Sequence, residues 1–413
     1  MYLTHLSLTN YRAFTRLDLD IPRRVLVLVG ANAQGKTSLL EAIYYLATFT
    51  SFHAANDRQL INFVAVGENP PDRNTAAAPG LVVARIVAEY HRAQRSHRME
   101  VRLILENAGN GSTRMRKEIL LDGVKRKAND ALGHFTAVIF LPQMTRILEN
   151  GPDERRRYLN LALSQAIPGY AQTLGDYAEV VTQRNALLKQ LGERGGDPDQ
   201  LCYWNELLAD KGAVIIHARI AAIQEIEKIA GRIHQRLTNG SEVLRLFYQP
   251  AYDPLPAPAN GQITLPLRQV QAERTGFTRE QIHKGFLERL EQVRAEEINR
   301  GVTTIGPHRD ELRFLSSGVD LGDFGSRGQV RTTLLSLKLA EVVWLKEKTG
   351  QWPVLLLDEV LAELDLQRRA DLLAAVAESE QAVVTATDLH MFAQDFLTET
   401  TIWKVNAGRV EEN

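Results

Sequence analysis

Residues 30–37, Gly-Ala-Asn-Ala-Gln-Gly-Lys-Thr, match the phosphate-loop pattern Gly-x₄-Gly-Lys-[Ser/Thr] at every fixed position. In this pattern the glycines let successive backbone N–H groups point at a phosphate, and the helix that follows adds its positive N-terminal end. Lys36 would neutralise β- and γ-phosphate oxygens, and the Thr37 hydroxyl would bind Mg²⁺. A glycine-rich turn without a ligand is the alternative, but a buried strand before the loop and a helical pattern after it disfavour that interpretation. The predicted ATP-binding residues are Gly30, Ala31, Asn32, Ala33, Gln34, Gly35, Lys36, Thr37 and Ser38.

A second pattern that fits nucleotide chemistry is the apolar run at 354–357, which ends in the acidic pair Asp358 and Glu359. At the end of a buried strand, Asp358 would hold Mg²⁺ beside Thr37. Glu359 would position and polarise the attacking water, because catalysis of phosphoryl transfer rests mainly on alignment and charge stabilisation. An ordinary strand followed by a polar turn would have the same sequence, and the intact phosphate loop favours the catalytic interpretation. Glu359 and Lys36 are therefore the predicted catalytic residues.

A third pattern, Ser-Arg-Gly-Gln at 326–329, lies between the other two and directly precedes an amphipathic helix. It resembles the signature motif of ABC-type ATPases, although four residues are a short match and a plain helix N-cap at Ser326 is the alternative. In ABC-type ATPases the signature completes the nucleotide site of the opposite subunit, so the resemblance implies ATP-dependent dimerisation. The run Ala-Glu-Leu-Asp at 362–365 resembles the loop that crosses the same interface. The residues expected to act across the dimer are Ser326, Arg327, Gly328, Gln329 and Asp365.

The elements that must position these residues alternate between strand and helix at both ends of the chain. Apolar patterning predicts strands at 2–9 and 25–29 and a helix from about residue 36. Beyond residue 306 the predicted strands are 311–315, 354–357, 382–386 and 401–405, and the predicted helices are 327–348, 366–378 and 388–397. This alternation is typical of a mainly parallel sheet. The two ends of the chain are therefore expected to form one α/β domain.

The middle of the chain has a different organisation. Three β-type runs between residues 81 and 125 predict a small antiparallel sheet, with turn signals at 110–111 and 122–123. The Pro- and Ala-rich segment 68–80 is expected to be an exposed loop.

Helical patterns dominate from there to residue 299. Two helical stretches within 153–237, separated by a polar breaker at 192–200, predict an antiparallel helical hairpin. The stretch 249–266 is Pro-rich and irregular, and a further helix is expected at about 278–299. This segment is expected to be an insertion in the α/β domain.

The composition excludes some classes of protein. A single cysteine, Cys202, leaves no intramolecular disulfide and no cysteine metal cluster. No run approaches the roughly 20 apolar residues of a membrane span. The N-terminus also lacks the order of a secretory signal. A cytoplasmic protein without a membrane partner is therefore expected.

The charge is unevenly distributed along the chain. The net charge of −1 gives no global attraction to nucleic acid, but residues 85–127 hold eleven Arg and Lys against five Asp and Glu. A local basic face of this kind could bind DNA phosphates without reading bases. A solvated sheet face is the alternative. The candidate DNA-binding residues are Arg92, Arg95, Arg98, Arg114, Arg116, Lys117, Lys125, Arg126 and Lys127.

The order of these patterns resembles the RecF family of SMC-like ATPases over essentially the whole chain. The matches span residues 3–373, and the stretch 190–280 contributes little to them. Residues 142–160 resemble the family run Pro-[Glu/Asp]-x₈-Pro-x₂-Arg-Arg-x-[Phe/Tyr]-Leu-[Asp/Asn], and 356–373 resemble its second signature. Gly-Pro-His-Arg-Asp at 306–310 also resembles a family element. Residues 3–14 resemble the N-terminal segment of the family, with Arg12 at the position of its Asn-[Phe/Tyr]-Arg element. The resemblance implies that Arg12 belongs to the ATP site. The implied fold is an ABC/SMC-type P-loop ATPase head with a small antiparallel sheet, at 1–150 and 301–413, and an inserted helical hairpin arm, at 151–300.

The resemblance leaves several positions with open roles. Gln143 replaces the usual acidic residue and suits the glutamine loop of ABC-type ATPases, which contacts Mg²⁺ and water. Thr385 and Thr387 stand at the position where a transporter has its switch histidine. Thr387 is predicted to lie near the γ-phosphate, with an ordinary β-branched strand end as the alternative. His308 and Arg309 receive no catalytic role. The triplet 155–157 could bind phosphate or serve the helix start on which it lies.

The function implied by the resemblance is ATP-dependent binding of double-stranded DNA near single-strand gaps, in replication and recombinational repair. Weak, DNA-dependent ATP hydrolysis would act as a conformational switch that releases the DNA. The implied cofactors are ATP and Mg²⁺, and the implied partners are a second copy of the chain, RecR, and functionally RecO and RecA. A transporter subunit would carry a switch histidine and lack the long insertion, and a full SMC or break-repair head would need a far longer coiled coil. A non-hydrolysing nucleotide-gated scaffold is disfavoured by Glu359 but stays open.

Overall fold

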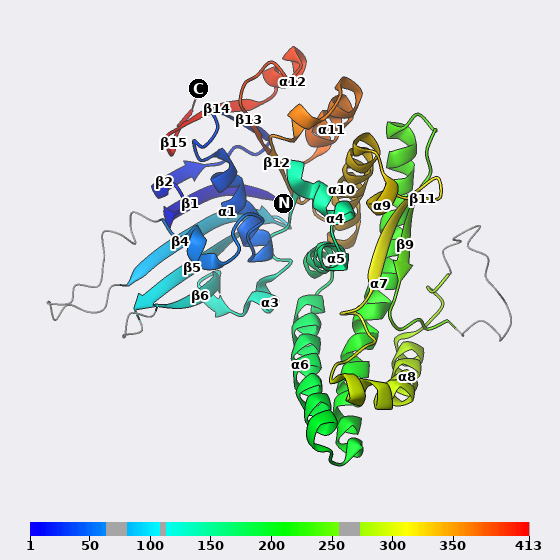
Figure 1. Cartoon of the computed structure of the whole chain (residues 1–413). Helices are drawn as coiled ribbons and strands as arrows, with labels where there is room; N and C mark the ends of the chain where they lie inside the picture. Colours follow the sequence, from blue (N-terminus) through cyan, green and yellow to red (C-terminus); the bar gives the residue numbers. More distant parts are fainter. Residues whose placement is uncertain (63–80, 108–112, 256–272, 413) are drawn as a thin grey trace, which may run out of the picture. The chain divides into compact units, whose positions relative to one another are not determined.

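A computed structural model describes residues 1–62, 81–107, 113–255 and 273–412 (Figure 1). The chain divides into two compact units, one made of Met1–Gln143 with Glu341–Asn413 and the other of Met144–Ala340. The first unit therefore joins the two ends of the chain, as the alternation of strand and helix indicates. The loop expected at 68–80, the turn expected at 110–111 and residues 256–266 of the irregular stretch lie outside the described residues.

The first unit contains a mainly parallel sheet in the order β15-β14-β3-β13-β12-β8, in which only β15 runs antiparallel to its neighbour. Its strands are β3 (Val25–Val29), β8 (Ala137–Phe140), β12 (Val354–Asp358), β13 (Ala382–Ala386), β14 (Thr401–Asn406) and β15 (Arg409–Glu412). The three central strands are almost entirely buried and apolar, as strands of a parallel sheet covered on both faces must be. The predicted strands 25–29, 354–357, 382–386 and 401–405 are confirmed.

Three helices of this unit follow the strands that carry the predicted chemistry. They are α1 (Lys36–Thr48), α11 (Leu366–Glu378) and α12 (Gln394–Thr398). The helix predicted at 388–397 is wrong for most of its length, since only its last residues are helical. The Asp388 side chain accepts a hydrogen bond from the backbone of His390 at 3.0 Å, and this local turn competes with helix.

The second sheet of the first unit is antiparallel, in the order β2-β1-β4-β5-β6-β7. Its strands are β1 (Tyr2–Tyr11), β2 (Phe14–Asp20), β4 (Val82–Arg92), β5 (Arg95–Asn107), β6 (Thr113–Leu121) and β7 (Val124–Arg126). The predicted antiparallel sheet is confirmed and is larger than expected, because β1 and β2 join it. The predicted turn at 122–123 is also confirmed, with positive φ at Asp122 (51°) and Gly123 (79°).

The second unit is dominated by the predicted helical hairpin. Its helices include α5 (Pro152–Ala166), α6 (Tyr170–Arg194), α7 (Leu201–Leu237) and α8 (Arg279–Arg300). Helices α6, α7 and α8 lie side by side (Figure 1). The polar breaker does end α6, and Thr278 and Gln281 form a capping box that starts α8. Among the described residues no helix has both the length and the apolar character that crossing a bilayer requires.

A three-stranded antiparallel sheet, β11-β10-β9, completes the second unit. It is made of β9 (Leu244–Gln249), β10 (Glu311–Ser316) and β11 (Val319–Asp320), followed by the short α9 (Leu321–Phe324) and by α10 (Arg327–Thr349), which crosses into the first unit. The strand predicted at 311–315 therefore exists, but its expected place in the parallel sheet is wrong. The residue before it explains why: buried Asp310 accepts hydrogen bonds from Arg219 (2.6 Å) and Tyr248 (2.5 Å), which tie β10 to α7 and β9.

Candidate nucleotide site

The phosphate loop lies between β3 and α1, as its pattern predicts. At Gly30 a Cβ atom would lie 2.3 Å from the Val405 carbonyl oxygen, so no side chain fits there. Gly35 has φ 111°, a conformation that favours glycine, and stands at the N-cap of α1 without a side-chain cap. The first N–H groups of α1 therefore face the loop without intrahelical partners, which suits an anion.

Lys36 is the cation of this loop and is only 3% exposed. Its Nζ donates to the carbonyl oxygens of Gly30 (2.7 Å) and Ala31 (3.0 Å) and lies 3.1 Å from Glu359 Oε1. The two predicted catalytic side chains are thus in direct contact. A buried ammonium at the mouth of the loop supplies the positive charge that phosphate oxygens require.

Asp358 is the buried carboxylate of the site and connects the end of β12 to β13 and to the first turn of α1. The Thr37 hydroxyl donates to Asp358 Oδ1 at 3.0 Å, and the Thr385 hydroxyl donates to the same oxygen at 2.8 Å. Burial raises the pKa of Asp358 above its ordinary value, and the charge of Glu359 adds to this, while the two threonine hydrogen bonds oppose it. Since a metal ion binds the ionised form, its binding at Asp358 is expected to weaken as the pH falls towards that raised pKa.

Glu359 follows Asp358 in a left-handed conformation, with φ 51°. A non-glycine residue adopts this conformation at a cost of about 1–3 kcal/mol, and such strain clusters at functional sites. The Glu359 N–H donates to Thr385 Oγ1 at 3.0 Å, which helps to hold the strained turn. The Glu359 side chain is directed at Lys36 and remains 35% exposed, so water can reach it.

The sequence gives Thr385 no role beyond its place at the switch position, although its hydroxyl contacts both members of the acidic pair. Thr385 is 1% exposed at the end of β13, the strand between β3 and β12. A threonine near the end of an otherwise apolar buried strand was the available sequence signal. Thr387, the predicted switch residue, is exposed just past the same strand, and its hydroxyl lies 3.4 Å from Asp388.

Two other residues predicted to bind ATP, Arg12 and Gln34, form contacts with neighbouring helices and turns. Arg12 forms a two-bond ion pair with Glu41 of α1, at 2.7 and 2.8 Å. Gln34 accepts hydrogen bonds from the turn between β14 and β15, through Ala407 (2.6 Å) and Gly408 (3.1 Å). Both residues therefore hold the elements around the loop. Ala31, Asn32 and Ala33 are exposed, and Ser38 is half-buried in the first turn of α1.

The residues available to Mg²⁺ fit that ion only together with a nucleotide. Among the described residues no three His, Cys, Asp or Glu side chains gather as a metal site. Asp358 and Thr37 offer oxygen atoms, and Mg²⁺ commonly binds one or two carboxylates plus substrate phosphates. Exposed Gln143 follows β8, whose last residue pairs with Leu357 of β12, so it emerges at the same edge of the sheet.

The predicted signature corner, residues 326–329, forms the N-terminus of α10 in the second unit. Ser326 Oγ accepts from the Gln329 N–H (3.3 Å), and the Ser326 N–H donates to Gln329 Oε1 (3.1 Å). This reciprocal pair is a capping box, so the N-cap interpretation holds for the chain by itself. Arg327 and Gly328 are exposed. Asp365 is likewise the N-cap of α11, accepting from the Arg368 N–H at 2.9 Å.

The candidate DNA-binding residues divide into paired and unpaired groups. Arg92 donates to two backbone carbonyls, Lys117 contacts Asp57, and Arg98, Arg116 and Lys125 each contact a glutamate of the same sheet. These contacts reduce the basic excess that the sequence suggested for 85–127. The exposed candidates without an ion pair among the described residues are Arg95, Arg114, Arg126 and Lys127.

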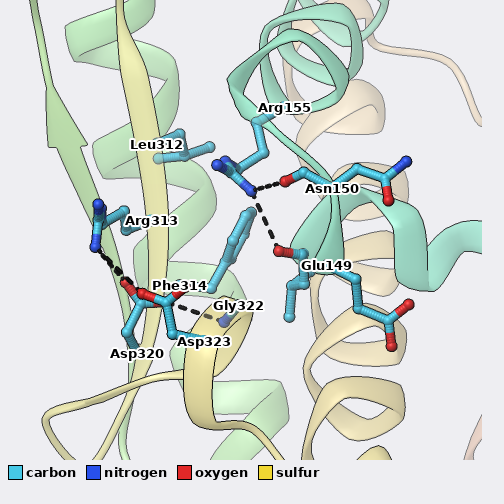
Figure 2. Close-up of a pocket in the computed structure, with 10 residues that line it drawn as sticks. Glu149, Asn150, Arg155, Leu312, Arg313, Phe314, Asp320, Gly322 and Asp323 are labelled. Carbon is cyan, nitrogen blue, oxygen red and sulfur yellow. Dashed lines mark hydrogen bonds and ion pairs between the residues drawn. The ribbon is translucent and has the colours of Figure 1, made fainter.

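Arg155 and Arg156, two residues of the triplet whose role was left open, form contacts within the second unit. Arg155 donates to the carbonyls of Leu148 (3.2 Å) and Asn150 (2.5 Å) at the edge of a small pocket (Figure 2). It also binds Glu311 of β10. Arg156 donates to the Asp310 carbonyl at 2.6 Å. Their guanidinium groups hold α5 to β10, which is the structural alternative considered for 155–157.

His308 is also tied into this unit. Its ring nitrogens lie 2.8 Å from the Tyr177 hydroxyl and 3.2 Å from the Thr303 carbonyl. Burial lowers the pKa of His308 below its ordinary value, so the ring is neutral at pH 7. The neighbouring Arg309 is exposed.

Comparison with known proteins agrees with this geometry. The family model described as RecF/RecN/SMC N terminal domain matches residues 2–408. Proteins named DNA replication and repair protein RecF from Roseiflexus castenholzii and Chloroflexus aurantiacus are 37% and 38% identical, each over 99% of both chains. The chain belongs to the RecF family. A solved structure described as the recombination mediator protein RecF-ATP in the RecFOR pathway has a TM-score of 0.79 and 27% identity, covering 100% of this chain and 99% of that one. The fold is that of a RecF/SMC-type ATPase head.

The role of Thr385 can be tested by replacing it with valine, which keeps the shape and removes the hydroxyl. Asp358 and the Glu359 N–H would each lose a buried hydrogen bond, so Thr385→Val should lower the free energy of unfolding by about 1–3 kcal/mol. The matched control, Thr387→Val at the exposed position just past the same strand, should change the free energy of unfolding by less than about 0.5 kcal/mol. Urea denaturation of both variants makes the measurement, and equal effects would contradict the assignment.

Proposed function

We propose that the protein is an ATP-dependent DNA-binding ATPase of recombinational repair and replication that works as a homodimer closed by ATP. The observation that carries the proposal is the division of the nucleotide machinery. The phosphate loop, Asp358 and Glu359 are assembled in one unit, whereas the signature corner is a separate, exposed helix N-terminus. Membership of the RecF family supports this interpretation.

ATP binding would use the groups already directed at the loop. Lys36 would exchange its contact with Glu359 for β- and γ-phosphate oxygens, and the free N–H groups of α1 would bind the β-phosphate. Mg²⁺, held by Thr37 and Asp358 together with ATP, supplies charge neutralisation at the γ-phosphate. The bond from Thr385 keeps the Asp358 carboxylate fixed while the ion binds.

Hydrolysis would depend on Glu359. Once Lys36 binds phosphate, the exposed carboxylate is free to accept a hydrogen bond from water and to align it with the γ-phosphorus. The strained turn at Glu359 directs the side chain to the mouth of the loop. Turnover is proposed to be slow, with hydrolysis acting as the switch that releases DNA.

Dimerisation would follow from the donors of the signature corner. The Ser326 hydroxyl accepts one hydrogen bond but donates none to the described residues, and the N–H groups of Arg327 and Gly328 begin α10 without partners there. A γ-phosphate bound to a second copy would satisfy these donors. ATP then binds the dimer more tightly than the monomer, which shifts the equilibrium to the closed form.

DNA binding is proposed to be independent of sequence and to use the basic residues of the antiparallel sheet, and of the segment next to it, that form no ion pair with the described residues. They are Arg95, Arg114, Arg126 and Lys127. The related solved structure is described as that of a recombination mediator protein in the RecFOR pathway. By analogy, we propose double-stranded DNA near single-strand gaps as the ligand of this protein. RecR is the proposed direct partner, with RecO and RecA acting in the same process.

Two substitutions separate ATP binding from hydrolysis. Lys36→Met should abolish ATP binding, because the buried ammonium has no substitute. Glu359→Gln should keep ATP binding and reduce hydrolysis by about a hundredfold or more, since a general base of this kind contributes about 10²–10⁴-fold. Filter binding with labelled ATP and a phosphate-release assay measure the two properties.

The variants Lys36→Met and Glu359→Gln also test whether ATP hydrolysis releases DNA. With ATP, Glu359→Gln should retain duplex DNA longer than the wild type, whereas Lys36→Met should show no ATP-dependent retention. Unchanged hydrolysis in Glu359→Gln would remove the proposed role of Glu359. Equal DNA retention by all three proteins would remove the ATP switch.

The basic surface is tested through the salt dependence of DNA binding. Replacing Arg95, Arg114, Arg126 and Lys127 together with alanine should weaken ATP-dependent duplex binding. It should also reduce the slope of log K against log salt by about 0.9 for each phosphate that the protein no longer neutralises. The control is Lys125→Ala, which removes a lysine already paired with Glu118 at 2.7 Å and should leave the slope nearly unchanged. An unaltered slope in the fourfold variant would place the DNA surface elsewhere.

A further inference from the structure

A network of polar side chains around Glu242 contacts Gln329 of the signature corner, and the proposed function gives this network no role. Glu242, between α7 and β9, receives three contacts. Gln329 Nε2 donates to Glu242 Oε1 at 3.2 Å, Ser316 Oγ donates to Oε2 at 2.6 Å, and His234 Nε2 lies 3.4 Å from Oε2. His234 is fully buried, and its other ring nitrogen lies 3.2 Å from the hydroxyl of Ser336 on α10. One carboxylate therefore joins α7, β10 and the first turn of α10.

The contact with Glu242 decides which way the Gln329 amide points. Because its NH₂ group is committed to Glu242, its carbonyl oxygen faces the Ser326 N–H, and the capping box closes. With the N–H of Gln329 bonded to the Ser326 oxygen, the hydroxyl hydrogen of Ser326 is left to donate outwards. If the amide were free to rotate, its NH₂ group could face the Ser326 N–H, and the corner would lose half of its capping box.

The charge of Glu242 suits this task. Burial alone would raise the pKa of Glu242, but hydrogen bonds from Ser316, Gln329 and His234 together bring it below the ordinary value. An ionised carboxylate accepts stronger hydrogen bonds than a neutral amide does. Its side chain remains 23% exposed, so the network is reached by water and does not form part of an apolar core.

We propose that Glu242 is a positioning residue for ATP hydrolysis, which holds the Gln329 amide so that the signature corner presents the Ser326 hydroxyl and the first N–H groups of α10 to the ATP of a second copy. This inference rests on the proposed dimer. Glu242 itself touches neither nucleotide nor water in the reaction; it acts through Gln329, and its effect is felt in the opposite subunit.

The first test replaces Glu242 with alanine. Glu242→Ala should lower the hydrolysis rate at saturating ATP about tenfold or more, because a charge-assisted bond that orders the corner is removed. At protein concentrations where the chain is monomeric, Glu242→Ala should bind ATP with the same affinity as the wild type, since its phosphate loop is intact. The control, Glu193→Ala, removes an exposed carboxylate at the end of α6 and should behave as the wild type. Wild-type hydrolysis by Glu242→Ala would overturn the proposal.

The second test asks whether the effect crosses between subunits. Mixing Glu242→Ala with Lys36→Met should restore hydrolysis, because one of the two sites in the mixed dimer combines an intact phosphate loop with an intact corner. If the mixture stays inactive while wild-type protein dimerises with ATP, Glu242 acts within its own subunit or through misfolding, and the proposal fails. If wild-type protein itself does not dimerise, the proposed function fails first, so the two failures are distinguishable.

A double variant shows whether Glu242 acts through Gln329. Gln329→Ala should reduce hydrolysis by a similar factor, and the variant carrying both changes should be no slower than the slower single variant, within about twofold. If the two separate reductions in hydrolysis rate multiply in the double variant, Glu242 and Gln329 have independent roles. That result would overturn the proposal that Glu242 acts through the Gln329 amide.

Discussion

The pairing of β13 with both β3 and β12 is the constraint on which the nucleotide site depends. The phosphate loop follows β3 and the acidic pair follows β12, and Thr37 and Asp358 are 321 residues apart in the sequence. Parallel register places Thr385 of β13 opposite Leu28 on one side and Asp358 on the other. The Thr385 hydroxyl then bonds both Asp358 and the Glu359 N–H. One strand thereby converts two distant motifs into a single site.

The same arrangement explains how strain is held at the acidic pair. Glu359 occupies a left-handed conformation and Asp358 is a buried carboxylate, and each alone would be unfavourable. The hydroxyls of Thr37 and Thr385 donate to the carboxylate, and Thr385 also accepts a hydrogen bond from the Glu359 N–H in the turn. The strained turn places Glu359 Oε1 3.1 Å from Lys36 Nζ, at the mouth of the phosphate loop.

Much of this site could be predicted from the sequence because its motifs are local. The phosphate loop, the acidic strand and the helix at 366–378 have signals within a dozen residues, and the structure confirms these elements. Features that depend on tertiary contacts were missed or misplaced. The residues at 311–316 have the pattern of a strand but do not indicate which strand they pair with. In the structure they pair with β9, next to buried Asp310, which accepts hydrogen bonds from Tyr248 of β9 and Arg219 of α7. The turn between β4 and β5 uses Ala93 and Gln94 at positive φ, residues without a turn signature. The importance of Thr385 depends on its neighbours in the sheet.

The central claim is that the nucleotide site remains incomplete until a second copy supplies its signature corner. Sedimentation velocity over a wide range of protein concentration tests it most directly, with saturating ATP and Mg²⁺, with ADP and Mg²⁺, and without nucleotide. The account predicts a dimer with ATP only, and a monomer under all three conditions for Ser326→Arg, whose bulky side chain would block the corner without touching the phosphate loop. A wild-type protein that stays monomeric in saturating ATP and Mg²⁺ would contradict the account.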